Sequence, residues 1–365
     1  MRIALVVPGG VDRSEEYRVI PALLALIRRL ALHADVHVFA LHQEKTAAEW
    51  LFATAVVHNI GVPYTRLRAV REIRRVHLST PFDLIQAIWS GSCGMIAVAT
   101  AKVLGIPSFI HVAGGELVSM PEIGFGGLQT WRGRLREPLV LRLARTVTAA
   151  SAPVIDSLSA FGLEALRIPL GVDLQLWPKR DPLARHVGRP MRLIHVASLN
   201  RVKDQETLLR ALASLAKSGE AFELDVIGED TLQGQVMALA DTLGLSSRVR
   251  FHGFLTQRQL RPLMEAADLM IHTSRHETGP LVVMEAAVAG VPTVGTAVGH
   301  IAEWAPHAAL AVPVGDWASL AKAIRRVMLD DALRMRLAEN ACRLAAREDA
   351  DYTAACFLSL YRSVV

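Results

Sequence analysis

Short apolar runs alternate along this chain with longer segments in which apolar residues recur at helical spacing. The runs predict strands near 2–7, 35–40, 83–88, 107–112 and 146–149, and again near 192–197, 222–227, 249–251, 268–272, 292–295 and 310–312. Amphipathic helices are predicted between them, such as 22–32 and 205–217, the second starting after Asp204 and stopping at Gly219. This alternation predicts an α/β protein with two Rossmann-like, doubly wound parallel sheets, each covered by helices on both faces.

The alternation is interrupted between Ile168 and Pro190 by a stretch that is rich in proline and charge and has no apolar period. Such stretches connect domains, so we place a hinge near residue 172. The prediction is an N-terminal domain over 1–172 and a C-terminal domain over 173–349, each long enough to bury its own core.

Composition narrows the class of protein. Fifty-two per cent of the 365 residues are apolar, which argues against a disordered chain. No apolar run approaches the roughly 18 residues of a membrane-spanning helix, and the first run, Ile3 to Val7, is too short for a signal peptide. These features predict a cytoplasmic protein. Three scattered cysteines do not make a disulfide framework, so we expect reduced packing residues: Cys93, Cys342 and Cys356.

The formal net charge of +5 arises entirely from the first half, where residues 1–172 hold eighteen Lys/Arg and thirteen Asp/Glu. The densest basic positions form two clusters: Arg66, Arg68, Arg71, Arg74 and Arg75, then Arg132, Arg134 and Arg136. Two interpretations are open. One is peripheral contact with an anionic membrane at its inner face; the other, which is commoner, is a solvated basic face on an ordinary helix. Few aromatic residues accompany the arginines, so nucleic acid is not an expected partner.

The most informative polar pattern is a pair of glutamates, Glu277 and Glu285, eight positions apart. A short apolar strand precedes the first glutamate, and Pro280, which suits the first position of a helix, precedes the second. The loop residue Gly279 and a helix starting near Leu281 would offer backbone N–H groups and a positive dipole end to an anion. The pattern predicts a phosphate site flanked by two carboxylates; two solvated glutamates at an ordinary junction are the alternative.

Two further stretches follow predicted strands, at the sheet edge where open α/β folds bind ligands. Arg201 and Lys203 come after the first strand of the second domain, and we expect Lys203 to contact phosphate. A cation fixed at this edge can stabilise the negative charge of a phosphate group. Gly9 and Gly10 follow the first strand of the chain, where glycine lets the backbone approach a ligand closely.

The stretch from His276 to Val294, with Gly299-His-Ile-Ala-Glu303 after it, resembles the signature of glycosyltransferase family 4, the retaining nucleotide-sugar transferases of the GT-B fold. The resemblance extends over nearly the whole chain. It implies two Rossmann-like domains facing a cleft, with a last helix over 350–365 crossing back to the N-terminal domain. It also implies that Glu277 lies near the donor sugar and that Glu285 binds the ribose of the nucleotide.

The chain departs from the family pattern at two places, in the loop after Glu277 and at the position five residues before Lys203. The family commonly reads Glu-Gly-Phe-Gly ahead of the helix, whereas this chain has Glu277-Thr-Gly-Pro280, which keeps a flexible residue and a helix starter. An arginine usually stands five positions before the lysine, but that position is Ser198, and we expect Arg201 to replace it from a neighbouring direction. The Gly-Gly pair after the first strand resembles the glycine loop of the family, which approaches donor phosphate or acceptor.

The segment ending at Glu116 resembles the strand end where many family members have a histidine, then glycine and an acid. Two alignments are open: His111 is the family histidine shifted, or its position is Ala113 and the histidine is missing. The second alignment puts Gly114, Gly115 and Glu116 in register, so these three residues and His111 are the candidate acceptor-binding residues. A buried, hydrogen-bonded core histidine explains His111 equally well.

The resemblance implies a retaining hexosyltransferase that moves a sugar from a nucleoside-diphosphate sugar to a hydroxyl acceptor: a glycan, a lipid-linked molecule or a small molecule, in polysaccharide or glycolipid biosynthesis. It implies no metal and no cofactor beyond the donor. Asp349-Ala-Asp351 has the spacing of an Asp-x-Asp metal motif, but it precedes the predicted last helix instead of following an early strand. The spacing of His272 and His276 supplies no further ligands for a zinc ion. The alternatives are a catalytically silent nucleotide-sugar-binding GT-B protein and a nucleotide-sugar epimerase. The sugar, the nucleotide, the acceptor and the oligomeric state stay open.

Overall fold

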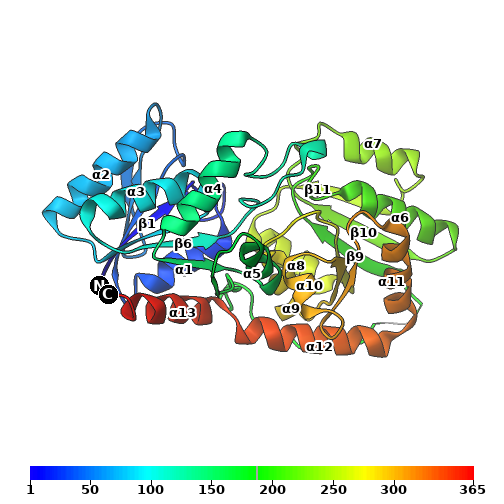
Figure 1. The fold of residues 1–365 in the computed structure, drawn as a ribbon. Helices are drawn as coiled ribbons and strands as arrows, with labels where there is room; N and C mark the ends of the chain where they lie inside the picture. Colours follow the sequence, from blue (N-terminus) through cyan, green and yellow to red (C-terminus); the bar gives the residue numbers. More distant parts are fainter. Residues whose placement is uncertain (186–187) are drawn as a thin grey trace. The chain divides into compact units, whose positions relative to one another are not determined.

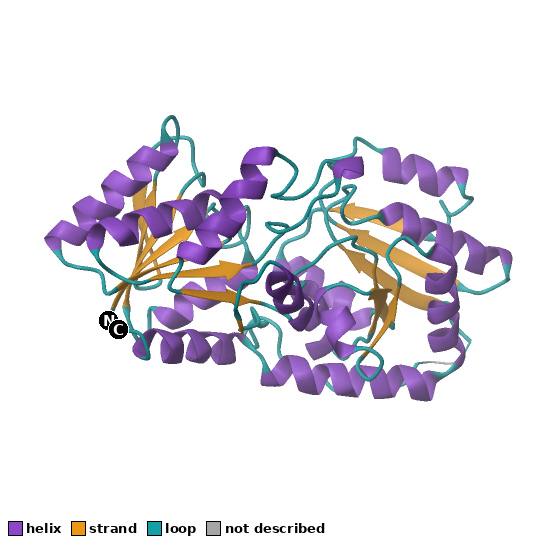
Figure 2. Cartoon of the chain, viewed as in Figure 1, coloured by secondary structure: helices purple, strands orange, loops and turns teal. Residues whose placement is uncertain are grey.

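A computed structural model describes residues 1–185 and 188–365; residues 186–187, inside the expected connector, lie outside the described part. The described residues form two compact units (Figure 1). The first unit comprises residues 1–173 and 348–365, and the second comprises residues 174–347. Figure 2 shows that each unit is a sheet with helices packed around it.

The sheet of the first unit has eight strands in the order β3-β4-β2-β1-β5-β6-β7-β8. Its strands are β1 (Arg2–Val7), β2 (Asp35–Ala40), β3 (Ala48–Phe52), β4 (Ala55–Asn59), β5 (Leu84–Ile88), β6 (Ser108–Val112), β7 (Thr146–Ala149) and β8 (Leu166–Arg167). Neighbouring strands are parallel except β3 and β4, which pair antiparallel. The strand order reverses between β1 and β5, and the carboxyl ends of such strands form the ligand-binding edge of an α/β sheet.

The sequence predicted five of these strands and missed β3, β4 and β8. β3 and β4 form a hairpin at one edge of the sheet, joined by Ala53 and Thr54. Ala53 has a φ of 52°, yet it is not the Gly, Asn or Asp that marks a tight hairpin in a sequence. β8 has only two residues, too few to show a strand period.

Alternate residues of each strand divide the core of the first unit into two layers. On β1, Ala4 and Val6 enter one layer, while Ile3 and Leu5 enter the other. The first layer is covered by α2 (Thr65–Ser79), α3 (Met95–Leu104), α4 (Trp131–Leu143) and α5 (Ala152–Ala160), and the second by α1 (Pro21–Leu30) and α13 (Ala350–Arg362). Two short turns also belong to this unit: η1 (Ser90–Gly94) and η2 (Pro121–Ile123).

The last helix, α13, packs on α1 within the first unit (Figure 1). Its residues Phe357 and Tyr361 are completely buried. The buried Arg29 of α1 donates from Nε to Asp351 Oδ1 at 2.5 Å and from Nη2 to Asp173 Oδ1 at 2.9 Å. A buried guanidinium needs such partners because an unpaired charge is costly inside a protein. The packing and the bond to Asp351 hold the C-terminal helix against α1.

The second unit contains a six-stranded parallel sheet in the order β11-β10-β9-β12-β13-β14. Its strands are β9 (Met191–Val196), β10 (Phe222–Ile227), β11 (Val249–Gly253), β12 (Leu269–His272), β13 (Thr293–Thr296) and β14 (Ala309–Val312). All six were predicted, within two residues at each end. The order reverses between β9 and β12, so the carboxyl ends of these two strands form the expected binding edge.

The helices of the second unit are α6 (Gln205–Lys217), α7 (Gln235–Thr242), α8 (Gln257–Ala266), α9 (Leu281–Val288), α10 (Gly299–Trp304), α11 (Trp317–Leu329) and α12 (Asp331–Arg347). The start of α6 is set by Asp204, whose carboxylate accepts a hydrogen bond from Thr207 Oγ1 at 2.9 Å and caps the Thr207 N–H. Gly219 follows its end with a φ of +82°. Every helix among the described residues is too short or too polar to cross a bilayer.

Candidate active site

The second unit gathers candidate residues at the carboxyl ends of β9 and β12. Lys203 lies in the loop after β9, and Glu277 lies in the loop after β12. Lys203 Nζ forms an ion pair with Glu277 Oε1, although the two residues are 74 positions apart in the chain. The same oxygen accepts a hydrogen bond from Ser274 Oγ at 2.6 Å and lies 3.1 Å from His272 Nε2. One carboxylate oxygen is therefore contacted by three side chains.

The loop that carries Lys203 is held by hydrogen bonds to its own backbone. Asn200 Oδ1 accepts from the N–H groups of Val202 and Lys203, both at 3.1 Å. Thr273 Oγ1, at the end of β12, donates to the Lys203 carbonyl oxygen at 2.9 Å. The side chains of Lys203 and Glu277 keep 25% and 14% of their surface exposed. The ion pair is thus fixed by the protein and still accessible to a ligand.

Glu277 is ionised in this environment. Burial alone would raise the pKa of its carboxyl, but the hydrogen bond to His272 and the charge of Lys203 hold the pKa of Glu277 well below its usual range. Because a carboxylate only accepts hydrogen bonds, the Nε2 atom of His272 carries the hydrogen. A fixed, ionised carboxylate can accept hydrogen bonds from the hydroxyl groups of a sugar.

A second histidine, His195 on β9, lies beside His272 with ring centroids 6.5 Å apart. Its Nδ1 is 2.9 Å from the Ile271 carbonyl oxygen, and its Nε2 is 3.2 Å from the Gln205 amide nitrogen. The carbonyl only accepts and the amide nitrogen only donates, so the ring is neutral. Burial lowers the pKa of His195 to about 4, which agrees with this state. His195 therefore adds no positive charge beside Glu277, whereas Lys203 does.

His272 and Ser274 were not predicted as site residues; His272 had been considered only as an incomplete zinc ligand. The sequence did contain a signal for these two site residues, because side chains two positions apart in an extended segment point to the same side. His272 and Ser274 have this spacing and lead directly to Glu277.

Glu285 on α9 occupies a different environment from Glu277. Its side chain is 3% exposed and is hydrogen-bonded to the side chain of Gln257 in α8. Gln257 Oε1 also accepts a hydrogen bond from Trp177 Nε1 at 2.5 Å. Burial raises the pKa of Glu285 to about 8, by more than the bond from Gln257 lowers it. The carboxyl is therefore mostly protonated at neutral pH.

Because Glu285 is buried, we expect the protein to lose stability as the pH rises. Its folded pKa of about 8 is raised from 4.5, so the stabilisation is full below the unfolded pKa and is lost as the pH rises towards 8. We expect the free energy of unfolding to fall by about 3 to 5 kcal/mol across this window. Glu285→Gln should remove most of that slope, as measured by urea unfolding at a series of pH values. Glu229→Gln makes the same change on an exposed side chain and is the control; an unchanged slope in Glu285→Gln would refute the assignment.

The start of α9 lies beside Glu277. Pro280 is the N-cap residue, with φ −66° and ψ 111°, and the helix begins at Leu281, where the sequence predicted its start. Gly279 is half-buried in the same turn. A Cβ on Gly299, whose φ is +47°, would lie 2.8 Å from Pro280 Cδ. Only glycine fits there, so the start of α10 packs directly against the loop that holds Glu277.

Arg201 stands apart from this cluster. Its side chain is exposed, and within the described ranges 1–185 and 188–365 no ion pair joins it to a carboxylate. Ser198, which occupies the position of the family arginine, gives its carbonyl oxygen to Gln205 Nε2 at 3.1 Å. The structure brings Lys203, and not Arg201, to Glu277, and the role of Arg201 stays a prediction.

The first unit places Gly9 and Gly10 at the carboxyl end of β1. The N–H groups of Gly10 and Val11 both donate to Gln43 Oε1, at 2.7 and 2.9 Å. Gly10 has a φ of +82°, and a Cβ there would lie 2.6 Å from Ile20 Cγ1, so packing alone requires glycine. Gln43 was not predicted from the sequence, and its side chain accepts the hydrogen bond of the Gly10 N–H. Contact of Gly9 and Gly10 with the donor stays a prediction.

Glu116 folds back into its own loop after β6. Its buried carboxylate accepts hydrogen bonds from the N–H groups of Gly114 at 2.7 Å, Ser90 at 3.2 Å and Ala113 at 3.3 Å. Burial raises the pKa of Glu116, and these N–H groups oppose the shift. The carboxylate therefore ties the ends of β5 and β6 together. Acceptor binding by Glu116, Gly114 and Gly115 stays a prediction, to which the structure adds this structural contribution.

His111 on β6 has no exposed surface. Its Nδ1 lies 2.9 Å from Thr148 Oγ1, and its ring packs against Phe357 with centroids 5.6 Å apart. Burial lowers the pKa of His111 to about 3. This environment is the one expected of the core-histidine alternative, and acceptor binding by His111 stays a prediction.

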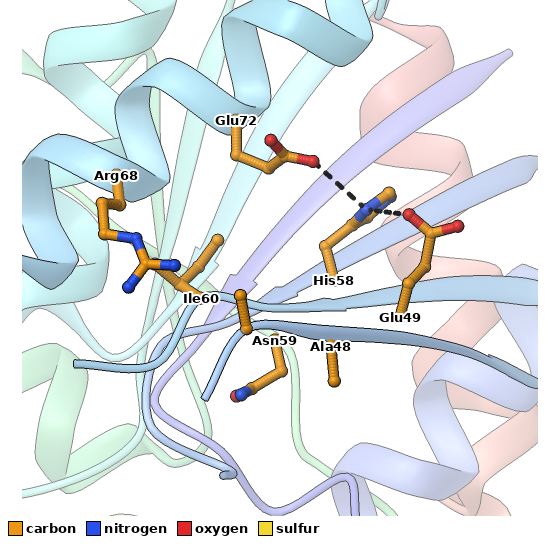
Figure 3. A pocket seen from close by; sticks show the side chains of 8 residues that line it. Ala48, Glu49, His58, Asn59, Ile60, Arg68 and Glu72 are labelled. Carbon is orange, nitrogen blue, oxygen red and sulfur yellow. Dashed lines mark ion pairs between the residues drawn. The ribbon is translucent and has the colours of Figure 1, made fainter. Parts of the chain in front are cut away.

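A polar pocket of about 320 Å³ lies in the first unit between the β3–β4 hairpin and α2 (Figure 3). His58 Nδ1 lies 3.0 Å from Glu49 Oε2 and 3.8 Å from Glu72 Oε1, and its Nε2 lies 2.9 Å from His37 Nδ1. The pocket lining includes none of the predicted site residues. Throughout the part of the chain that the structure describes, no three His, Cys, Asp or Glu side chains gather in a way that would hold a metal ion.

Comparison with known proteins identifies the family. The family model of Glycosyl transferases group 1 matches residues 184–343, and that of the Glycosyl transferase 4-like domain matches residues 19–171. The chain is 30% identical to the D-inositol 3-phosphate glycosyltransferase of Salinispora arenicola (strain CNS-205) over 314 residues, which cover 78% of this chain and 69% of that protein. Two further curated relatives align with this chain over only 61% and 53% of their own lengths.

Solved structures share the architecture. Sucrose-phosphate synthase from Thermosynechococcus elongatus matches with a TM-score of 0.84 at 19% identity, over 100% of this chain and 99% of that chain. Anabaena Alr3699/HepE, solved in complex with UDP and glucose, matches with a TM-score of 0.75 at 21% identity, over 100% of both chains. At these identities the structures show the fold alone, which is the GT-B fold of two parallel-sheet α/β domains. With the family models and the Salinispora relative, this places the chain in the group 1, or family 4, glycosyltransferases.

Proposed function

We propose that this glycosyltransferase is a retaining, metal-independent enzyme that moves a hexose from a nucleoside-diphosphate sugar to a hydroxyl acceptor. The observation that carries the proposal is the ion pair of Lys203 and Glu277 at the strand-order reversal of the second sheet, beside the start of α9. A cation and a helix start suit a diphosphate, and a fixed carboxylate suits sugar hydroxyls. The UDP and glucose bound by Anabaena HepE support a donor of this class.

In the proposed reaction, the bond between the anomeric carbon and the diphosphate oxygen breaks, and the acceptor oxygen bonds to the same face of that carbon. Lys203 stabilises the negative charge that builds on the departing diphosphate. The departing oxygen takes the proton of the acceptor hydroxyl, so the reaction needs no separate base. Glu277 accepts hydrogen bonds from the sugar and orients it.

Glu285 is proposed to bind the ribose of the nucleotide. It lies one turn beyond the start of α9, and Glu277 lies just before that start, so the two carboxyls flank the helix end at which the diphosphate would bind. The ribose offers two neighbouring hydroxyl groups, and a protonated carboxyl can accept a hydrogen bond from one of them and donate to the other. The pairing explains why a buried carboxyl stands where an apolar residue would otherwise be favoured.

The experiment that tests the proposal is a thermal-shift panel of UDP-, GDP- and ADP-sugars, followed by product analysis by NMR. We expect one nucleotide series to raise Tm and the product to retain the anomeric configuration of the donor, with turnover unchanged by EDTA. Donor binding without hydrolysis or transfer would instead favour a silent nucleotide-sugar-binding protein. Release of an epimeric nucleotide sugar in the absence of acceptor would favour an epimerase.

A further inference from the structure

The outer side of α4 carries large apolar side chains where a helix on a polar surface would carry charged ones. Trp131, Leu135, Leu139 and Leu143 recur every four residues and are 67%, 67%, 55% and 52% exposed. The opposite side of the same helix buries residues such as Leu141 in the core of the first unit. A row of large apolar side chains that stays exposed marks a surface that binds a partner, and among the described residues nothing buries this row.

The helix α2 presents a matching stripe. Leu67, Arg71, Arg74 and Leu78 are all exposed, and their spacing of four, three and four residues puts them on one side of the helix. Tyr64, just before the helix, is exposed as well. Figure 1 shows α2, α3 and α4 side by side over one face of the first sheet, and all three enter the same core layer. We call this surface, the exposed residues of these three helices, the α2–α4 face.

The charge of the α2–α4 face is positive. Its three helices contain ten Lys/Arg and two glutamates. Both glutamates are already paired with arginines of their own helices, Glu72 with Arg75 and Glu137 with Arg136. At one end of α4 the guanidinium of Arg132 lies over the ring of Trp131, 5.3 Å from its centroid.

We infer that the α2–α4 face docks on an anionic lipid surface. Exposed leucines and a tryptophan would enter the boundary between headgroups and acyl chains, and the surrounding arginines would contact anionic headgroups. From the sequence, a solvated basic face was the commoner interpretation of these arginines. The apolar stripe of α4 distinguishes the two, because a merely solvated face does not expose a row of large apolar side chains. The inference does not depend on the proposed donor chemistry, which rests on residues of the second unit.

The test is cosedimentation of the full chain with vesicles of phosphatidylcholine alone and of phosphatidylcholine mixed with phosphatidylglycerol. We expect binding to the mixed vesicles, weakened by added salt, and little binding to the neutral ones. Leu135→Gln with Leu139→Gln should weaken binding at least about tenfold, and Arg71→Glu with Arg74→Glu about a hundredfold. The matched control, Leu329→Gln with Leu344→Gln, changes two exposed leucines of the second unit and should bind as the wild type does.

Two results would overturn the inference: pelleting of the Leu135/Leu139 variant at the wild-type level, or vesicle binding that is indifferent to anionic lipid. The inference would also be overturned if the protein formed a concentration-dependent dimer without binding vesicles and the Leu135/Leu139 variant abolished that dimer. In that case the α2–α4 face would pair with a second copy of the chain. Thermal shift with the nucleotide-sugar panel is recorded for every protein. Lost vesicle binding with a retained donor shift separates docking from the donor site, whereas a missing donor shift in the wild type counts against the proposed function alone.

Discussion

Glu277→Gln is expected to lower kcat about a thousandfold. Glutamine keeps the shape of the side chain but removes the negative charge that pairs with Lys203 and that orients the sugar. Donor affinity should change by less than about tenfold, because the diphosphate contacts remain and the lost interaction is proposed to strengthen in the transition state. Single-turnover kinetics give the chemical step, and titration calorimetry gives the donor Kd.

The control for this change is Glu229→Gln on the exposed surface of the same unit, which should keep wild-type turnover. Thermal unfolding of Glu277→Gln is measured in parallel, since removing one partner of a fully buried ion pair costs about 3–5 kcal/mol and this pair is only partly buried. Turnover near the wild-type level in a folded Glu277→Gln protein would remove the carboxylate from the mechanism.

Lys203→Met is expected to lower kcat/KM by a factor on the order of 10² to 10³. Methionine keeps much of the volume of the side chain but leaves the charge on the departing diphosphate without its nearest cation. Donor affinity should fall as well, because the diphosphate is charged already in the ground state. Lys203→Arg should restore part of the activity, since it keeps the charge with a different geometry. Steady-state kinetics with the donor identified by the thermal-shift panel measure both parameters.

The matched control is Lys217→Met, an exposed lysine at the end of α6. The double variant Lys203→Met with Glu277→Gln adds a second test. Residues that act as one unit are non-additive, so the double variant should lose little more activity than the worse single variant. Losses that multiply would show that the two side chains act independently.

The strands of the second unit illustrate what could be predicted. β12, for example, is a short, fully buried and mostly apolar run, and helices such as α6 carry their own cap, Asp204, beside the apolar stripe. These signals act over a few neighbouring residues, so they can be read from the chain. The β3–β4 hairpin could not be read in this way, because Ala53 makes its turn with a left-handed φ that the residue type does not announce.

In the candidate site, the two glutamates and the lysine could be predicted from the sequence but their contacts could not. Glu277, Glu285 and Lys203 were found because their residue types stand at loop and helix positions that suit an anion. Their contacts were not predictable: His272 and Ser274 reach Glu277, and Gln257 from another helix reaches Glu285. The same limit applies to His111, since nothing nearby in the sequence shows that its strand lies between two covered faces.

Apart from β3, β4 and β8, the sequence by itself determined where the strands of both units lie along the chain, together with the family and the residue types available for chemistry. Apolar periods and capping residues act locally, and motifs retain their spacing, so no tertiary information was needed. Only the tertiary structure decided the protonation states of those residues. Glu277 is held ionised by a lysine from a distant loop, while Glu285 is left protonated by burial. It also decided that the leucines of α4 face outwards, because which side of a helix is covered depends on the sheet against which it packs.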